Sequence, residues 1–204
     1  MNKSYLYLMT TFMLWGSLYV VSQFVLGKIP TFTVAMFRYL IAFIALSFIS
    51  LKSKKEKIEK SDYKYFFIMG FIGYFISVDC QLLGTKIAGG SMASLINSLN
   101  PVIISVMAMI ILNEKLEMNK IVGIVLSLAG VYMIIGTGAN IQFLGVLISF
   151  IAVIGWAFMS VISRKISNKY SALTLTKVSM LIATICNIPV SFLEVQMTHP
   201  LIQV

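Results

Sequence analysis

Three charged side chains lie inside long apolar segments of the chain, where they could bind an ion or a polar solute: Arg38, Asp79 and Lys177. A charge within a membrane is costly, and it usually marks a substrate site, a proton site or an ion pair. Counted from the ends of their segments, Arg38 and Asp79 lie at similar depths, about 10 Å at 1.5 Å per residue. They could therefore pair with each other or bind a solute or proton, whereas Lys177 could extend its ammonium group to the membrane surface.

Polar residues also gather around Pro101. Asn97 and Asn100 flank a series that recurs at steps of three and four residues, which keeps one face of a helix: Ser91, Ser94, Ser98, Pro101 and Ser105. Proline removes a backbone donor, so it should bend the helix. We interpret this segment as the wall of a cavity that offers amide groups to a substrate. Hydrogen-bonded helix packing is the alternative.

Two tryptophans, Trp15 and Trp156, lie away from the ends of their apolar segments, so an interfacial role does not suit them. They could form a cavity wall or fill the core. The signals of enzymes are missing from the sequence. The only histidine, His199, follows the last apolar segment, and there is neither a glycine-rich phosphate loop nor a pair of carboxylates within a segment. We therefore expect no catalytic residues, no metal site and no cofactor.

The composition determines which elements must position these side chains. Hydrophobic residues make up 59% of the 204 residues and charged residues only 11%, with a mean hydropathy of +0.93. A soluble domain is about half apolar and about a quarter charged. We therefore predict an all-α membrane protein, because helices satisfy their own backbone hydrogen bonds in lipid. Seven transmembrane helices are expected, at about Tyr5–Leu26, Thr31–Leu51, Tyr65–Thr85, Ser91–Leu112, Ile121–Thr137, Ile141–Ser163 and Ala172–Val195.

The positive charges alternate between the two sides of the predicted membrane. Twelve of the sixteen Lys and Arg residues would lie on the side of the N-terminus, half of them in the loop 52–64. Only Lys28 and Lys86 would lie on the other side. The positive-inside rule then places the N-terminus in the cytoplasm. The net charge of +9 is explained in this way, so we do not take it as a sign of nucleic-acid binding.

An internal repeat relates the first and the sixth predicted helices. A shift of 141 residues aligns Trp15 with Trp156, Lys28 with Lys169 and several residues of the next helix, such as Thr33 with Thr174. Five helices separate the two starts, so the second copy would enter the membrane from the opposite side. Inverted repeats are the architecture of secondary transporters. We predict one complete five-helix repeat over residues 5–137 and a partial second repeat over residues 141–204.

The ordered set of motifs resembles the drug/metabolite transporter superfamily, specifically its EamA-like domain. The resemblance includes Leu14-Trp15-Gly16-Ser17, Phe37-Arg38-Tyr39 and Leu99-Asn100-Pro101-Val102, and continues through Leu112-Asn113-Glu114-Lys115-Leu116 to Gly155-Trp156-Ala157. It implies two inverted halves of five helices each. It also implies export or exchange of small metabolites or drugs across the plasma membrane, here of a bacterium. The glutamate that follows the family's fourth helix matches Glu114, which we interpret as a structural anchor.

This chain ends after seven predicted helices instead of the ten that the resemblance implies, so three readings stay open. The first is a solute transporter whose cavity would be lined by Trp15, Arg38, Asp79, Asn97 and Asn100. It could be a homo-oligomer or lack its C-terminal half. The second is a truncated, non-transporting membrane remnant or partner subunit. The third is a seven-helix retinal protein, which the predicted orientation disfavours. The lipid bilayer and a small solute are the expected partners.

Overall fold

The computed structural model describes residues 3–52, 56–113, 118–135 and 142–198, and every regular element in these ranges is helical. The helices are, in order, α1 (Lys3–Leu26), α2 (Thr31–Ser50), the 3₁₀ turn η1 (Lys60–Asp62), α3 (Tyr63–Ile68), the π-helix η2 (Met69–Ile76), α4 (Ser77–Ala88), α5 (Gly90–Asn97), α6 (Asn100–Leu112), α7 (Met118–Ile135), α8 (Phe143–Ile166) and α9 (Ala172–Thr198).

Six helical segments within the described residues are long and apolar enough to cross a membrane. A crossing requires about 20 residues, and these six contain 20 to 29 residues each. Large apolar side chains on their outer faces are exposed, for example Phe24 at 75% and Phe48 at 68%. In lipid such side chains are at no disadvantage, so the prediction of an all-α membrane protein is confirmed. The fifth predicted helix corresponds to α7, and the total of seven crossings stays a prediction.

The fourth predicted helix is interrupted close to Pro101, the residue from which the sequence predicts a bend. The chain turns at Ser98–Leu99, between α5 and α6, and Pro101 occupies the first turn of α6. The break precedes Pro101 because the proline has no N–H to bond the carbonyl oxygen four residues earlier. The third predicted helix is continuous, but η2 gives its middle a π-helical conformation that the sequence did not indicate.

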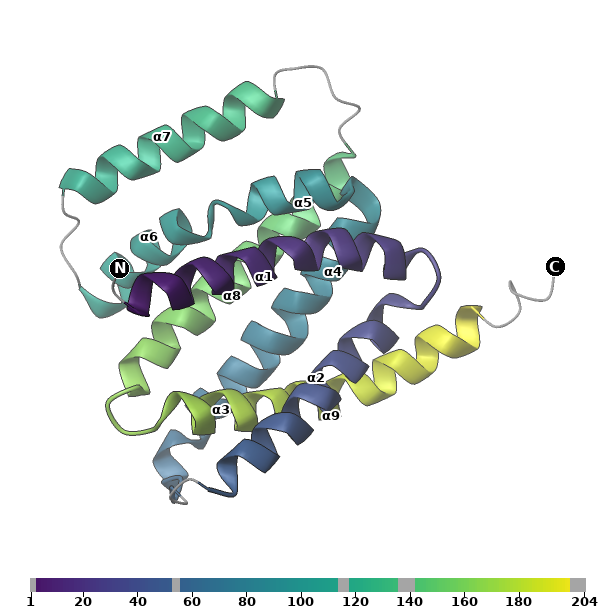
Figure 1. Ribbon diagram of the computed structural model, residues 1–204, viewed down its shortest axis with the longest axis vertical. Coiled ribbons are helices and arrows are strands. Elements are labelled where there is room, and N and C mark those ends of the chain that lie inside the picture. The colour runs from purple at the N-terminus through teal and green to yellow at the C-terminus, as the bar shows by residue number, and fades with distance from the viewer. Residues whose placement is uncertain (1–2, 53–55, 114–117, 136–141, 199–204) are drawn as a thin grey trace.

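The helices that pack most closely are not neighbours along the chain. In Figure 1, α2 and α9 lie side by side, and η2 and α4 cross α8. Glycines make the second crossing possible. A Cβ atom at Gly73 would lie 2.1 Å from Cγ of Met159, and one at Gly145 would lie 2.7 Å from the backbone nitrogen of Ala88. Short loops make consecutive helices antiparallel, but small residues decide which helices come into contact.

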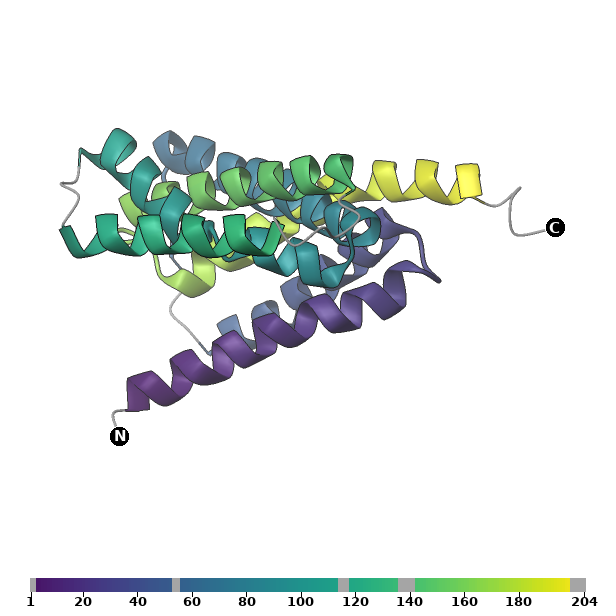
Figure 2. The ribbon, with the colours of Figure 1, turned by 90° about the horizontal axis from the view of Figure 1, so that it is seen from above.

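Two helices lie at the edge of the bundle. Figure 2 shows α1 on one face, with its N-terminal half diverging from the other helices. Among the side chains of α1 whose burial the structure describes, the buried ones belong to its second half: Tyr19, Ser22 and Leu26. α7 packs against α6 at the upper edge of Figure 1. The core therefore lies between α2, η2, α4, α8 and α9, and it is closed on one side by the second half of α1.

Candidate functional site

A cavity of about 350 Å³ lies where α1, α2, η2, α4, α5, α6, α8 and α9 meet. Pockets for small molecules usually measure about 300–1,000 Å³, so one small solute would fit. The helices contribute side chains from both predicted repeats. The wall consists of Trp15, Leu18, Tyr19, Arg38, Tyr39, Tyr74, Ser77, Val78, Gln81, Asn97, Asn100, Ala152, Trp156 and Met180.

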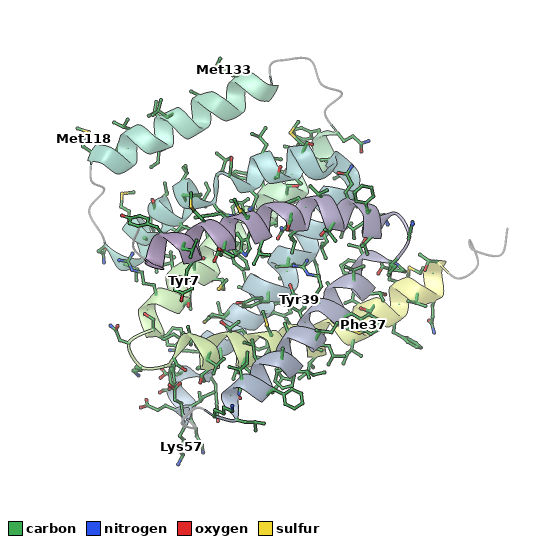
Figure 3. The ribbon with its side chains drawn as sticks, viewed as in Figure 1. Tyr7, Phe37, Tyr39, Lys57, Met118 and Met133 are labelled. Atoms are coloured by element: carbon green, nitrogen blue, oxygen red, sulfur yellow. The ribbon has the colours of Figure 1, made fainter. Side chains whose placement is uncertain are left out.

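Aromatic rings form a continuous part of this wall. Trp15 meets Trp156 edge to face with 5.4 Å between ring centroids, Trp156 meets Tyr74 at 5.8 Å, and Tyr74 meets Tyr39 at 6.0 Å. The hydroxyl of Tyr39 also donates a 2.6 Å hydrogen bond to the carbonyl oxygen of Tyr74. In Figure 3, Tyr39 lies near the centre of the molecule. Edge-to-face pairs fix one another's orientation, so these rings provide a firm apolar surface contributed by four helical elements.

The two predicted charges of this region occupy different places. Arg38 lines the cavity, and its buried Nη1 has no hydrogen-bond partner among the described residues. Asp79 does not line the cavity. It is only 4% exposed, neither of its carboxylate oxygens has a hydrogen-bond partner in the described part of the chain, and Asn187 lies beside it. The expected Arg38–Asp79 ion pair is therefore wrong: the two side chains interact electrostatically, but they form no hydrogen bond to each other.

The polar segment around Pro101 divides in an unexpected way. Asn97 and Asn100 line the cavity, and Nδ2 of Asn100 donates a 2.6 Å hydrogen bond to Oδ1 of Asn97. The serines do not line it. Instead the hydroxyls of Ser94, Ser98 and Ser105 donate to backbone carbonyl oxygens three or four residues earlier. Pro101 is exposed. The expected serine face is therefore wrong, because the interruption before Pro101 turns the asparagines inward and the serines away.

The remaining predicted residues have structural settings. Trp156 lines the cavity together with Trp15. Lys177, in α9, donates a 3.1 Å hydrogen bond from Nζ to Oγ of Ser50 at the end of α2, and it does not line the cavity. Glu114 falls outside the described residues. The described part of the chain contains no group of three or more His, Cys, Asp or Glu side chains that could hold a metal ion.

Several wall residues were not predicted: Leu18, Tyr19, Tyr39, Tyr74, Ser77, Val78, Gln81, Ala152 and Met180. A signal for some of them exists in the spacing. Tyr74, Ser77, Val78 and Gln81 recur at steps of three, one and three residues, and so they share one helix face. This face combines polar and aromatic residues within an apolar segment. Charged and amide side chains alone do not mark this helix face as part of a cavity wall.

A glutamate caps the start of α2. The carboxylate of Glu194, near the end of α9, accepts hydrogen bonds from the backbone N–H groups of Thr31, Phe32 and Thr33 at 2.7, 2.8 and 3.3 Å. These are among the N–H groups that an α-helix leaves without partners at its N-terminus. A carboxylate is also favoured there by the helix dipole. The end of α9 is thereby fixed to the beginning of α2.

The opposite end of this helix pair carries a similar contact. Both carboxylate oxygens of Glu56, which follows α2, accept hydrogen bonds from the backbone N–H of Ser171, just before α9, at 3.2 and 3.0 Å. This N–H group lowers the pKa of Glu56 below its usual value. Nearby, Nζ of Lys169 lies 3.1 Å from Oδ2 of Asp62, and this hydrogen bond raises the pKa of Lys169. Oη of Tyr170 donates to the same oxygen at 2.9 Å.

Comparisons with known proteins agree with this architecture. The model of the EamA-like transporter family matches residues 2–136. The chain is 27% identical over 187 residues to an uncharacterized transporter of Bacillus subtilis, YetK, which covers 88% of this chain and 57% of that protein. It is 23% identical over 183 residues to an uncharacterized transporter of Archaeoglobus fulgidus, which covers 90% of this chain and 65% of that protein. The chain therefore spans about three fifths of the length of these curated relatives.

Proposed function

This chain belongs to the EamA-like transporter family, and from that membership we propose that it exports or exchanges small metabolites or drugs by alternating access through its central cavity. The single observation that carries the proposal is the cavity itself. Its wall combines Arg38 and the amides of Asn97 and Asn100 with four aromatic rings. Polar groups enclosed in an apolar membrane protein are usual where a polar solute passes.

The proposed mechanism uses the two inverted repeats, residues 5–137 and 141–204. Residues of both repeats line the cavity, and Trp15 contacts its repeat counterpart Trp156 there. Contact between counterparts supports a pseudo-two-fold axis near the cavity. Rocking of one repeat against the other about this axis would expose the cavity to each side in turn. The contacts of Glu194 and Glu56 close the two ends of the α2–α9 pair, and they would open alternately.

The proposed location is the plasma membrane of a bacterium, with the N-terminus in the cytoplasm. The distribution of Lys and Arg residues supports this orientation. The loop 52–64 and the segment around Lys169 would then lie on the cytoplasmic side. The start of α2, with its Glu194 cap, would lie on the outer side.

Solute movement in proteoliposomes tests the proposal. The full chain is reconstituted, and saturable counterflow is measured for a panel of radiolabelled amino acids, nucleosides and organic acids. A cavity-filling variant, Leu18→Trp, adds bulk at the cavity wall. Leu6→Trp, at a 52% exposed position of the same helix, is the matched control. We expect counterflow of at least one solute by the wild type and by Leu6→Trp, and its loss in Leu18→Trp.

The alternative is a membrane partner that does not transport. The chain spans 57–65% of the length of the curated relatives described above, so transport has to be tested on this chain itself. Absence of counterflow for every solute, together with a stable complex of larger size in native mass spectrometry, would support this alternative and contradict the proposed transport. Equal counterflow by wild type and Leu18→Trp would show that solutes do not pass through the cavity.

A further inference from the structure

We infer that the cavity binds a small aromatic carboxylate, with its carboxylate group at Arg38 and its ring against the aromatic wall. The inference deepens the proposed transport function by naming the substrate class, and it rests on that function for the passage of the bound solute. Binding itself can be tested without transport. Three features of the cavity support the inference: the charge of its wall, the unpartnered Nη1 of Arg38, and the arrangement of the aromatic rings.

The charge of the wall selects the sign of the ligand. Of the fourteen described wall residues, Arg38 is the only one with a side chain that is charged at neutral pH. A guanidinium group stays protonated in proteins, so the wall of the cavity itself carries one positive charge in a low-dielectric environment. A cationic ligand would add a second positive charge. A single anionic group would neutralise the first.

The donor groups select the type of anion. Nη1 of Arg38 is buried without a hydrogen-bond partner among the described residues. Buried polar atoms without partners are rare and call for an explanation such as a missing ligand. The planar guanidinium fork matches the two oxygens of a carboxylate. A carboxylate here would give Arg38 the partner that no described side chain supplies.

Asp79 does not already fill this role. Its carboxylate forms no hydrogen bond to Arg38 and does not line the cavity. It lies beside Asn187 of α9 instead. A ligand carboxylate would therefore approach Arg38 from the cavity without meeting Asp79 on the way.

The rings select the rest of the ligand. Trp15, Trp156, Tyr74 and Tyr39 form a series of edge-to-face contacts along the wall. Aromatic rings prefer further offset or edge-to-face partners, so a flat ring gains more from this wall than a flexible alkyl chain of equal size. A volume of about 350 Å³ admits one ring with a short carboxylate arm.

Tryptophan fluorescence provides a direct binding assay, because both tryptophans of the chain line the cavity. Four probes are titrated into the full chain in nanodiscs: 3-phenylpropionate, its neutral amide, 3-phenylpropylamine, and hexanoate as the ringless anion. We expect a saturable response to 3-phenylpropionate, with a dissociation constant at least about tenfold lower than those of the other three probes. The amide and the amine lack the negative charge that Arg38 would bind, and hexanoate lacks the aromatic ring.

Three variants localise the effect. Arg38→Gln should reduce the preference for the carboxylate over its amide to about one, whereas Arg38→Lys should keep part of it because the charge remains. Lys177→Gln removes a cation that lies inside a helix but outside the cavity wall, so it should leave the preference unchanged. Circular dichroism establishes that each variant is folded. Should Arg38→Gln not fold, the comparison of Arg38→Lys with Lys177→Gln still tests the assignment.

The outcomes separate this inference from the proposed function. Tighter binding of the amine, no response to 3-phenylpropionate, or an unchanged preference in folded Arg38→Gln would overturn the inference while transport of another solute could stand. Selective binding of the carboxylate without counterflow would retain the inference about the ligand and contradict transport. Selective binding with counterflow of aromatic carboxylates supports both.

Discussion

Arg38 and Asp79 are two charged residues at similar depth in the membrane, and their surroundings differ. Arg38 borders a cavity, so a ligand or water can solvate its guanidinium group. Asp79 is 4% exposed, and neither of its oxygens has a partner in the described part of the chain. A buried ionised group without a partner costs several kcal/mol. Burial of the carboxylate of Asp79 therefore lowers the stability of this conformation.

The first prediction concerns the substitution Asp79→Asn. Asparagine has nearly the same shape, and no hydrogen bond of the carboxylate is lost. We expect the free energy of unfolding at neutral pH to rise by about 1–3 kcal/mol, because the cost of burying the carboxylate, or of protonating it on folding, disappears. Thermal unfolding in nanodiscs measures the change.

Ser77→Ala, two residues earlier in the same helix, is the control. It removes the 2.7 Å hydrogen bond from Oγ of Ser77 to the carbonyl oxygen of Ala152, and it should cost about 1 kcal/mol. If Asp79→Asn is instead destabilised as much as Ser77→Ala, then Asp79 has a stabilising partner, and the account of its burial given above is wrong.

The sequence predicts which residues could line a binding site, but it does not predict the direction in which their side chains point. Arg38 and Asn97 stand out because they are polar within apolar segments, and both lie on the cavity wall. The Arg38–Asp79 pair fails for a geometric reason. Each residue turns a helix by about 100°, since a turn takes 3.6 residues, so equal depth says nothing about facing. Rotation of a helix about its axis is set by packing that a single sequence does not display.

Helices also differ from their expected form where the backbone is interrupted. The fourth predicted helix contains Pro101, and from it a bend could be predicted. The chain instead turns at Ser98–Leu99, and this directs Asn97 and Asn100 inward. The π-helix Met69–Ile76 has no comparable marker residue in the sequence. It lies where the chain contacts α8 and α9, and these contacts exist only in the assembled bundle.

The second prediction tests this crossing with Gly73→Ala. A Cβ atom at this position would lie 2.1 Å from Cγ and 2.4 Å from Cβ of Met159. The helices η2 and α8 would have to separate, because atoms so close to the backbone of a neighbouring helix have little room to move. We expect a loss of about 1–3 kcal/mol in the free energy of unfolding, measured by thermal unfolding in nanodiscs.

Gly16→Ala is the matched control. No described atom outside its own helix surroundings lies within 4 Å of a Cβ atom at Gly16. Alanine favours a helix over glycine by about 1 kcal/mol, so this variant should be neutral or more stable. Equal effects of the two substitutions would mean that helix propensity, and not the close contact with Met159, determines the result at position 73.

The whole molecule shows a reciprocity that supports the proposed inverted repeat. Trp15 contacts its counterpart Trp156, and α2 packs along its counterpart α9. At one end of this pair Glu194 caps α2, and at the other end Glu56 bonds the N–H group just before α9. The repeat shift of 141 residues places Glu194 opposite position 53, three residues from Glu56. Each helix therefore supplies a glutamate to the start of the other.

The sequence predicted the order of the helices and the repeat relation, but not this packing. In lipid, apolar surfaces gain little from meeting each other, and close packing together with polar contacts selects the partners. The polar contacts here join residues more than a hundred positions apart, such as Glu56 with Ser171 and Glu194 with Thr31. No local pattern marks such pairs, so the α2–α9 pair could be recognised only once the chain was folded.

The last prediction is that the two glutamate contacts can be opened one at a time. Glu56→Gln should increase hydrogen exchange at the amide of Ser171 and leave that of Thr31 unchanged, and Glu194→Gln should do the reverse.

Acid should have the same effect on the contact with Ser171 as the substitution Glu56→Gln. The pKa of Glu56 is lowered by the N–H of Ser171, so its stabilising effect is complete above the usual glutamate pKa of 4.5 and disappears as the pH falls through the lowered value. The difference in melting temperature between wild type and Glu56→Gln should thus be present at neutral pH and vanish in strong acid. Exchange that rises at both ends in either variant would contradict the independence of the two ends, on which alternating access depends.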